Sequence, residues 1–106
     1  MKLLFKTTNP TALKNDIIKL IEGDKLETWE IIIDNGEKYM KHIGQWGDKG
    51  VIKLEIDNVN LKLIVQVFKF KLTTLNVEDF EGYYLGRFCE LMFVNFPGQF
   101  TTIDKN

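Results

Sequence analysis

The stretch FEGYYLGRFCELMFVNF, residues 80–96, decides the fold, because it predicts a long helix with apolar side chains around almost its whole circumference. A helix of this composition must be buried on most of its surface. It carries the only arginine of the chain, Arg87, with Tyr83 one turn before it and Glu90 one turn after it. Residues at this spacing share one helical face. We therefore expect a charged cluster within an apolar surface, kept either for the fold or for a ligand.

The residues on both sides of this stretch predict where the helix begins and ends. Asn76 followed by Asp79 is typical of a helix start, because the two side chains can bond each other's backbone N–H groups. Pro97 and Gly98 predict its end, since neither residue continues a helix well. Residues 100–103 then predict a short last strand.

The N-terminal segment predicts a strand over residues 3–7 and then an amphipathic helix. Asn9 before Pro10 is typical of an N-cap followed by proline at the first helical position. The apolar residues of this helix recur with helical spacing and form one face, Leu13, Ile17, Leu20 and Ile21. Gly23 predicts a left-handed cap at its end.

The middle of the chain predicts a hairpin followed by two more antiparallel strands. Asn35-Gly36 is the strongest short hairpin signal, and with these two as the turn residues Trp29 faces His42. Residues 51–57 alternate as a strand with one apolar face. Residues 61–72 change their apolar face near Val65 to Phe68, which predicts a β-bulge or strong bend there.

Together these elements predict an α+β fold in two layers, with the order β-α-β-β-β-β-α-β. A four-strand antiparallel meander, with short terminal strands added, is covered by two helices on one face. A chain of 106 residues has the length of one domain, so we expect residues 1–106 to form a single domain.

Composition disfavours several classes of function. The net charge of −1 gives no field that would attract nucleic acid or an anionic membrane. Only one of the 14 basic residues is arginine, the side chain that suits phosphate recognition best. No apolar run is long enough for a signal peptide or a membrane span. We therefore expect a cytoplasmic protein that binds neither nucleic acid nor membrane.

The chain resembles a group of small bacterial proteins of uncharacterised function. The resemblance rests on Thr28-Trp29 in the first meander strand, Trp46 before the next, and Tyr84 with Gly86-Arg87-Phe88 in the long helix. It extends over nearly the whole chain. It implies a stand-alone α+β domain in bacteria, and it implies no activity, substrate or catalytic residue.

Four residues are candidates for a binding site: Arg87, Glu90, Tyr83 and Trp46. Arg87 either pairs with Glu90 or a sheet carboxylate, with Tyr83 capping it, or binds a carboxylate or phosphate in a cleft between helix and sheet. A contact with a partner protein is a third reading. Trp46 lies in a glycine-rich loop and either folds back over the core or lines a pocket mouth or an interface.

We expect no catalytic residues, no metal and no cofactor. His42 is the only histidine and pairs most simply with Trp29, and no cluster of cysteine, histidine and carboxylate has the spacing of a metal site. Cys89, the only cysteine, reads as a small core residue. The function we expect is a non-enzymatic protein-interaction module that self-associates or binds another protein. The alternative is a small-molecule or anion binder, or an enzyme, with a pocket around Arg87.

Overall fold

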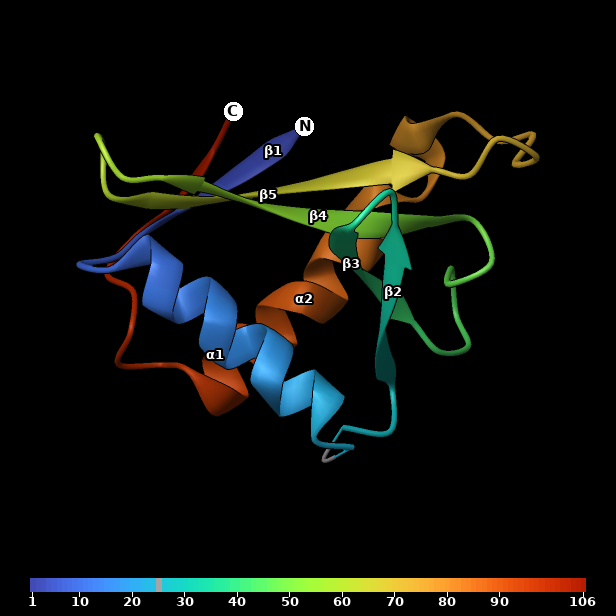
Figure 1. Ribbon diagram of the computed structural model, residues 1–106. Coiled ribbons are helices and arrows are strands. Elements are labelled where there is room, and N and C mark those ends of the chain that lie inside the picture. The colour runs from blue at the N-terminus through green and yellow to red at the C-terminus, as the bar shows by residue number, and fades with distance from the viewer. Residues whose placement is uncertain (25) are drawn as a thin grey trace.

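A computed structural model describes residues 1–24 and 26–106. The predicted α+β architecture and element order are confirmed: a six-stranded antiparallel sheet carries both helices on one face (Figure 1). The strands are β1 Lys2–Lys6, β2 Trp29–Asp34, β3 Glu37–His42, β4 Gly50–Asp57, β5 Lys62–Lys69 and β6 Ile103–Lys105. The helices are α1 Pro10–Glu22 and α2 Glu81–Asn95, with the short 3₁₀ turn Val77–Asp79 before α2.

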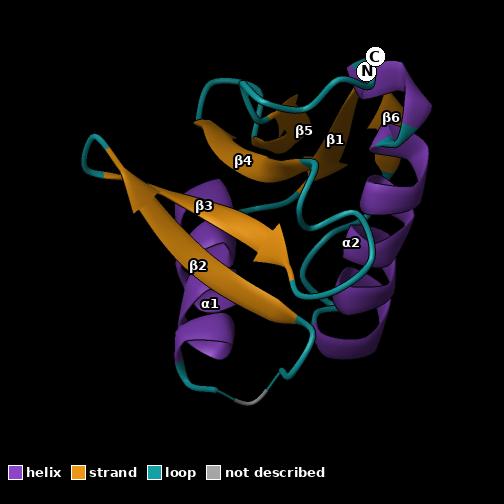
Figure 2. Ribbon diagram, turned by 90° about the vertical axis from the view of Figure 1, so that its right-hand side faces the viewer, coloured by secondary structure: helices purple, strands orange, loops and turns teal. Residues whose placement is uncertain are grey.

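The terminal strands extend the predicted meander on one side, giving the strand order β2-β3-β4-β5-β1-β6. β1 pairs with β5, and β6 pairs with β1, so the two ends of the chain lie side by side (Figure 2). This places β2 and β6 at the two edges of the sheet. The hydrophobic core lies between the sheet and the helices, with Phe5, Phe80 and Phe88 fully buried.

The predicted N-cap of α1 is confirmed, and its predicted left-handed C-terminal cap is not. Asn9 Oδ1 accepts a hydrogen bond from the N–H of Ala12 at 3.0 Å. The helix ends at Glu22, but Gly23 has a φ of −78°, so the expected left-handed glycine is wrong. The N–H of Gly23 still bonds to Lys19 C=O, and the left-handed residue is Asp24, with a φ of 57°. Aspartate tolerates this conformation better than most side chains.

The predicted hairpin is confirmed residue by residue. Asn35 and Gly36 have φ values of 50° and 80°, as a two-residue type I′ turn requires. Trp29 pairs with His42 and Ile31 with Met40. The hairpin then diverges from the rest of the sheet, because the only residues that pair between β3 and β4 in the described chain are Met40 and Ile52 (Figure 2).

The predicted bulge in β5 is wrong. The β4–β5 ladder runs without interruption from Gly50 opposite Lys69 to Asp57 opposite Lys62. The change of apolar face marks the end of the strand instead. Phe68 turns to the outer face and is half exposed, and β5 stops one residue later.

The prediction that the long helix is buried on most of its surface is also wrong. The turn capped by Asn76 and Asp79 is a separate 3₁₀ turn, and α2 begins only at Glu81. Its buried residues form one face, Glu81, Tyr84, Leu85, Phe88, Leu91 and Met92. In the described part of the chain, the opposite face meets the loop residues Trp46 and Phe100 but no other helix or strand, so Tyr83, Phe93 and Val94 are exposed by 63%, 57% and 76%.

Candidate functional site

Arg87 lies at the surface of α2. Its side chain is 43% exposed, and that of Glu90 is 65% exposed. Arg87 Nη1 donates to Glu90 Oε1 at 2.9 Å, and Nη2 donates to Gln45 Oε1 at 3.1 Å. The predicted pairing of Arg87 with Glu90 is therefore confirmed. Gln45, in the loop after β3, is a partner that no sequence pattern indicated.

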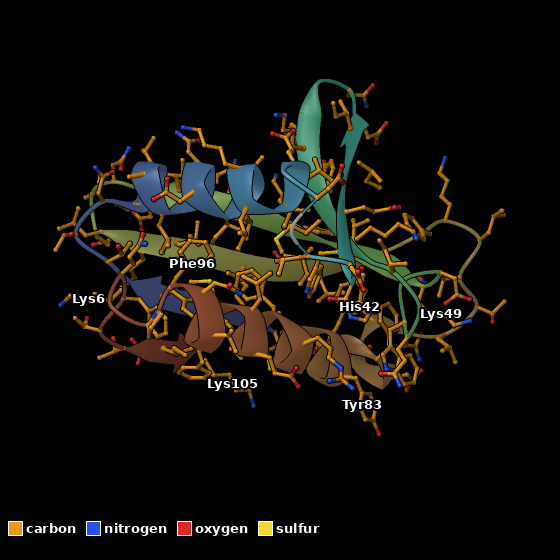
Figure 3. All side chains as sticks on the ribbon, turned by 90° about the horizontal axis from the view of Figure 1, so that it is seen from below. Lys6, His42, Lys49, Tyr83, Phe96 and Lys105 are labelled. Carbon is orange, nitrogen blue, oxygen red and sulfur yellow. The ribbon has the colours of Figure 1, made fainter. Side chains whose placement is uncertain are left out.

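Tyr83 does not cap Arg87. Its ring stacks on the indole of Trp46, with centroids 4.9 Å apart and planes 12° from parallel. Figure 3 shows Tyr83 projecting from α2 on its solvent side. Trp46 is half buried, packs against the core and has a φ of 63°, a left-handed conformation that is uncommon for a bulky residue. The loop therefore folds back and covers the core, as one of the two readings of Trp46 predicts.

A cleft of about 570 Å³ lies beside the Arg87–Glu90 pair. Its lining is largely apolar and comes from the start of β2, the loop after β3 and α2. Its polar side chains are those of Thr28, His42, Gln45, Arg87, Glu90 and Asn95, whereas Trp46 and Tyr83 lie outside it. The structure thus brings together two of the four predicted site residues and adds His42, which the sequence assigned only to pairing with Trp29.

His42 is held as a neutral side chain. It is 7% exposed and meets Trp29 edge-on at 4.9 Å, the predicted cross-strand pair. Its Nδ1 lies 2.9 Å from the C=O of Gln45, so Nδ1 is the protonated nitrogen of the ring. Burial lowers the pKa of His42, and the hydrogen bond to the Gln45 C=O offsets this only in part. Because Glu90 balances Arg87, the cleft carries no surplus positive charge to attract an anion.

Tyr84 fixes the backbone next to this cleft. Its side chain is 1% exposed, and its hydroxyl donates to the C=O of Gly50 at 2.8 Å. The same hydroxyl accepts a hydrogen bond from the N–H of His42 at 2.9 Å. It therefore bridges the ends of β3 and β4 where the two strands diverge. Burial raises the pKa of Tyr84 to about 12, so the phenol stays protonated and keeps its donor.

The remaining reactive groups give little sign of chemistry. Cys89 is half buried, and burial raises the pKa of its thiol, which is the opposite of activation. Across residues 1–24 and 26–106, no three side chains of histidine, cysteine, aspartate or glutamate are grouped closely enough to hold a metal ion. Neither helix of the described chain is long and apolar enough to cross a membrane.

No protein-family model, no curated protein and no solved structure matches the chain. A proposal for its function therefore rests on the geometry of the surface and of the cleft.

Proposed function

We propose that the chain is a protein-interaction module that self-associates through the outer face of α2. The observation that supports this most directly is the exposed apolar surface on that face. Tyr83, Phe93 and Val94 lie within about three turns of one helix and remain 57% or more exposed. A tyrosine on such a face is typical of protein interfaces, where aromatic residues contribute much of the binding energy.

Two glycines on the same face point to close approach by a partner. Gly82 and Gly86 lie one turn apart, and a Cβ added to either would meet nothing within 4 Å. Packing within the chain therefore gives no reason for glycine at these positions. Each glycine costs a helix about 1 kcal/mol relative to alanine. A second backbone lying against the helix would make use of the missing side chains.

The pattern along α2 complements itself in an antiparallel pair. Gly82 and Gly86 lie in the first half of the helix, whereas Phe93 and Val94 lie in the second half. A two-fold axis near Phe88 would set the large residues of each copy over the glycines of the other. Such reciprocal contact is what a symmetric dimer interface requires.

Charge complements itself in the same arrangement. With the helices antiparallel, Arg87 of one copy comes next to Glu90 of the other, while each remains close to its own partner. Opposite charges at the centre of the pair fix the register of the two helices. We therefore name a second copy of the chain as the partner, because the same face supplies both the apolar and the charged halves of the contact.

Sedimentation velocity tests this proposal. We expect the parent protein to dimerise at concentrations on the order of 100 μM, the range of a modest interface. Gly86→Gln should be monomeric there, because its side chain would occupy the contact. The fold of the variant should persist, since glutamine favours a helix and meets open space in the monomer.

Gly98→Gln is the matched control. Gly98 is also exposed with open space around it, but it lies beyond the end of α2. This variant should dimerise like the parent. A parent that stays monomeric at this concentration would contradict self-association. Equal dimerisation of the two variants would place the interface elsewhere.

The cleft beside Arg87 supports a second candidate function, the binding of a small ligand. Its apolar lining, and the pairing of Arg87 with Glu90 that leaves no surplus charge, favour an uncharged or amphiphilic molecule over a free anion. A thermal-shift screen that includes phosphate and acetate distinguishes the binding of an anion from the binding of an uncharged or amphiphilic molecule. A shift with these anions that disappears in Arg87→Met would favour anion binding, whereas no shift with any compound would leave the α2 face as the functional surface.

A further inference from the structure

The open edge of β2 presents an unpaired row of backbone groups. β3 pairs with one side of β2, and no described strand pairs with the other. The N–H of Ile43 bonds to the C=O of Thr28 at 2.7 Å, which fixes the phase of the β2–β3 ladder. Because bonded pairs alternate along an antiparallel ladder, Trp29, Ile31 and Ile33 turn their N–H and C=O groups toward the open edge.

The C-terminal end of α1 lies beside β2 (Figure 1). Residues from both elements line a groove along this edge. It has a volume of about 620 Å³. Six of its lining residues are apolar: Ile21, Leu26, Trp29, Ile31, Ile33 and Ile43. Ile33 is 66% exposed and Ile43 is 44% exposed, so the groove offers apolar contact next to the free backbone groups. An added strand could form backbone hydrogen bonds with β2 and apolar contacts with the groove.

The charge along the groove selects the occupant. Four carboxylate side chains line it: Glu22, Asp24, Glu27 and Glu30. Glu22 and Glu30 form ion pairs with Lys38 and Lys41, at 2.8 Å and 3.6 Å, but these pairs are accessible to solvent and therefore weak. The edge of a second copy would bring identical carboxylates together, which disfavours pairing between two β2 strands. A segment that carries lysine or arginine complements the charge.

We propose that the β2 edge binds an extended basic peptide segment, which joins the sheet as a seventh strand beside β2. The three outward residues of β2 offer one N–H and one C=O each, so the segment can form up to six backbone hydrogen bonds. Apolar side chains at alternate positions would lie over Ile31 and Ile33. Basic side chains at the other positions and at the ends would lie near the carboxylates. This surface is separate from the outer face of α2, and the proposal does not depend on self-association.

Fluorescence anisotropy with a labelled peptide of alternating valine and lysine, about seven residues long, tests the proposal. We expect saturable binding that weakens as salt is added, because the contact includes exposed charges. In ¹⁵N NMR spectra, the amide signals of Trp29, Ile31 and Ile33 should shift most. The same peptide methylated on alternate backbone nitrogens should lose its affinity, since its charge is unchanged but its donors are removed.

Two variants address the backbone and the charge separately. Ile33→Pro removes an outward N–H and leaves the β2–β3 ladder intact, as proline is tolerated at a strand edge. Glu27→Lys reverses one charge of the groove at an exposed residue. The loss of a backbone hydrogen bond should weaken peptide binding about tenfold, and the reversed charge should weaken it about threefold, because exposed charge pairs are individually weak. Glu55→Lys, on the exposed outer face of β4, is the matched control and should bind like the parent. Circular dichroism checks the fold, and if Ile33→Pro is unfolded, Glu27→Lys and the methylated peptide decide.

Several outcomes would overturn the proposal. Equal affinity for the methylated peptide would show that charge alone accounts for binding. The largest amide shifts on α2 or on the outer face of the sheet would place the site elsewhere. Shifts of the β2 amides on dilution of the protein alone would indicate that a second copy occupies the edge. Absence of binding would also count against it.

Discussion

Removal of the Tyr84 hydroxyl tests the account of how the divergent hairpin is held. That hydroxyl is the group that links the end of β3 to the start of β4, through the N–H of His42 and the C=O of Gly50. Tyr84→Phe keeps the ring, whose packing against Trp29 and Phe80 should not change. The substitution therefore isolates two hydrogen bonds from the surrounding apolar contacts.

The expected magnitude follows from the groups left behind. A buried donor or acceptor that loses its only partner costs about 1 to 3 kcal/mol, and here one donor and one acceptor are affected. Because His42 lines an open cleft, water can reach part of the vacated space and reduce the loss. We therefore expect Tyr84→Phe to lower the free energy of unfolding by about 2 to 3 kcal/mol.

Urea unfolding measures this change, and Tyr39→Phe is the matched control. Tyr39 lies in β3, and its hydroxyl bonds only to the exposed side chain of Glu37 at 3.1 Å. Its removal should change stability by less than about 0.5 kcal/mol. An unchanged m-value in both variants would show that the unfolding transitions are comparable. A Tyr84→Phe loss as small as that of Tyr39→Phe would refute the bridging role.

Three further predictions follow from the described contacts. Burial lowers the pKa of His42 below its ordinary value of 6.5. As the pH falls through 6.5, the unfolded chain therefore binds more protons than the folded chain, and the free energy of unfolding should decrease. In His42→Gln, urea midpoints should depend less on pH over this range. Arg87→Met should lower unfolding stability by less than about 1 kcal/mol, because the pair it breaks is exposed, and a larger loss in urea would contradict this. Asn9→Ala should cost about 1 kcal/mol by removing the N-cap of α1. Asn15→Ala, at an exposed position inside the same helix, is the control and should keep or raise the thermal midpoint, because alanine favours a helix more than asparagine does.

The parts of the fold that local chemistry determines could be predicted from the sequence. The side chains of Asn35 and Gly36 allow the positive φ values of a type I′ turn, and that turn fixes every pairing of the hairpin. The N-cap of α1 is equally local, since the Asn9 side chain bonds a backbone group three residues away. Both features depend on neighbours in the chain, and both were confirmed.

Features that depend on distant contacts could not be predicted in the same way. Tyr84 and the N–H of His42 are 42 residues apart, and no periodicity indicates that they meet. The cleft at Arg87 likewise depends on Gln45, which enters from a loop. The end of a strand and a β-bulge both reverse the apolar face, so the sequence of β5 predicts either. The uninterrupted pairing of β5 with β4 shows that the reversal marks the end of the strand.

The exposed face of α2, which its composition does not predict, bears most directly on function. Its composition indicated burial all round, and the described chain buries one face only. Gly82 and Gly86 lie in open space and lower the stability of the helix, and the apolar side chains exposed on the same face gain little from burial within the chain. Departures of this kind from local rules are expected where a surface serves a function. The composition of α2 is therefore consistent with burial on both faces, one against the sheet of its own chain and the other against a partner helix.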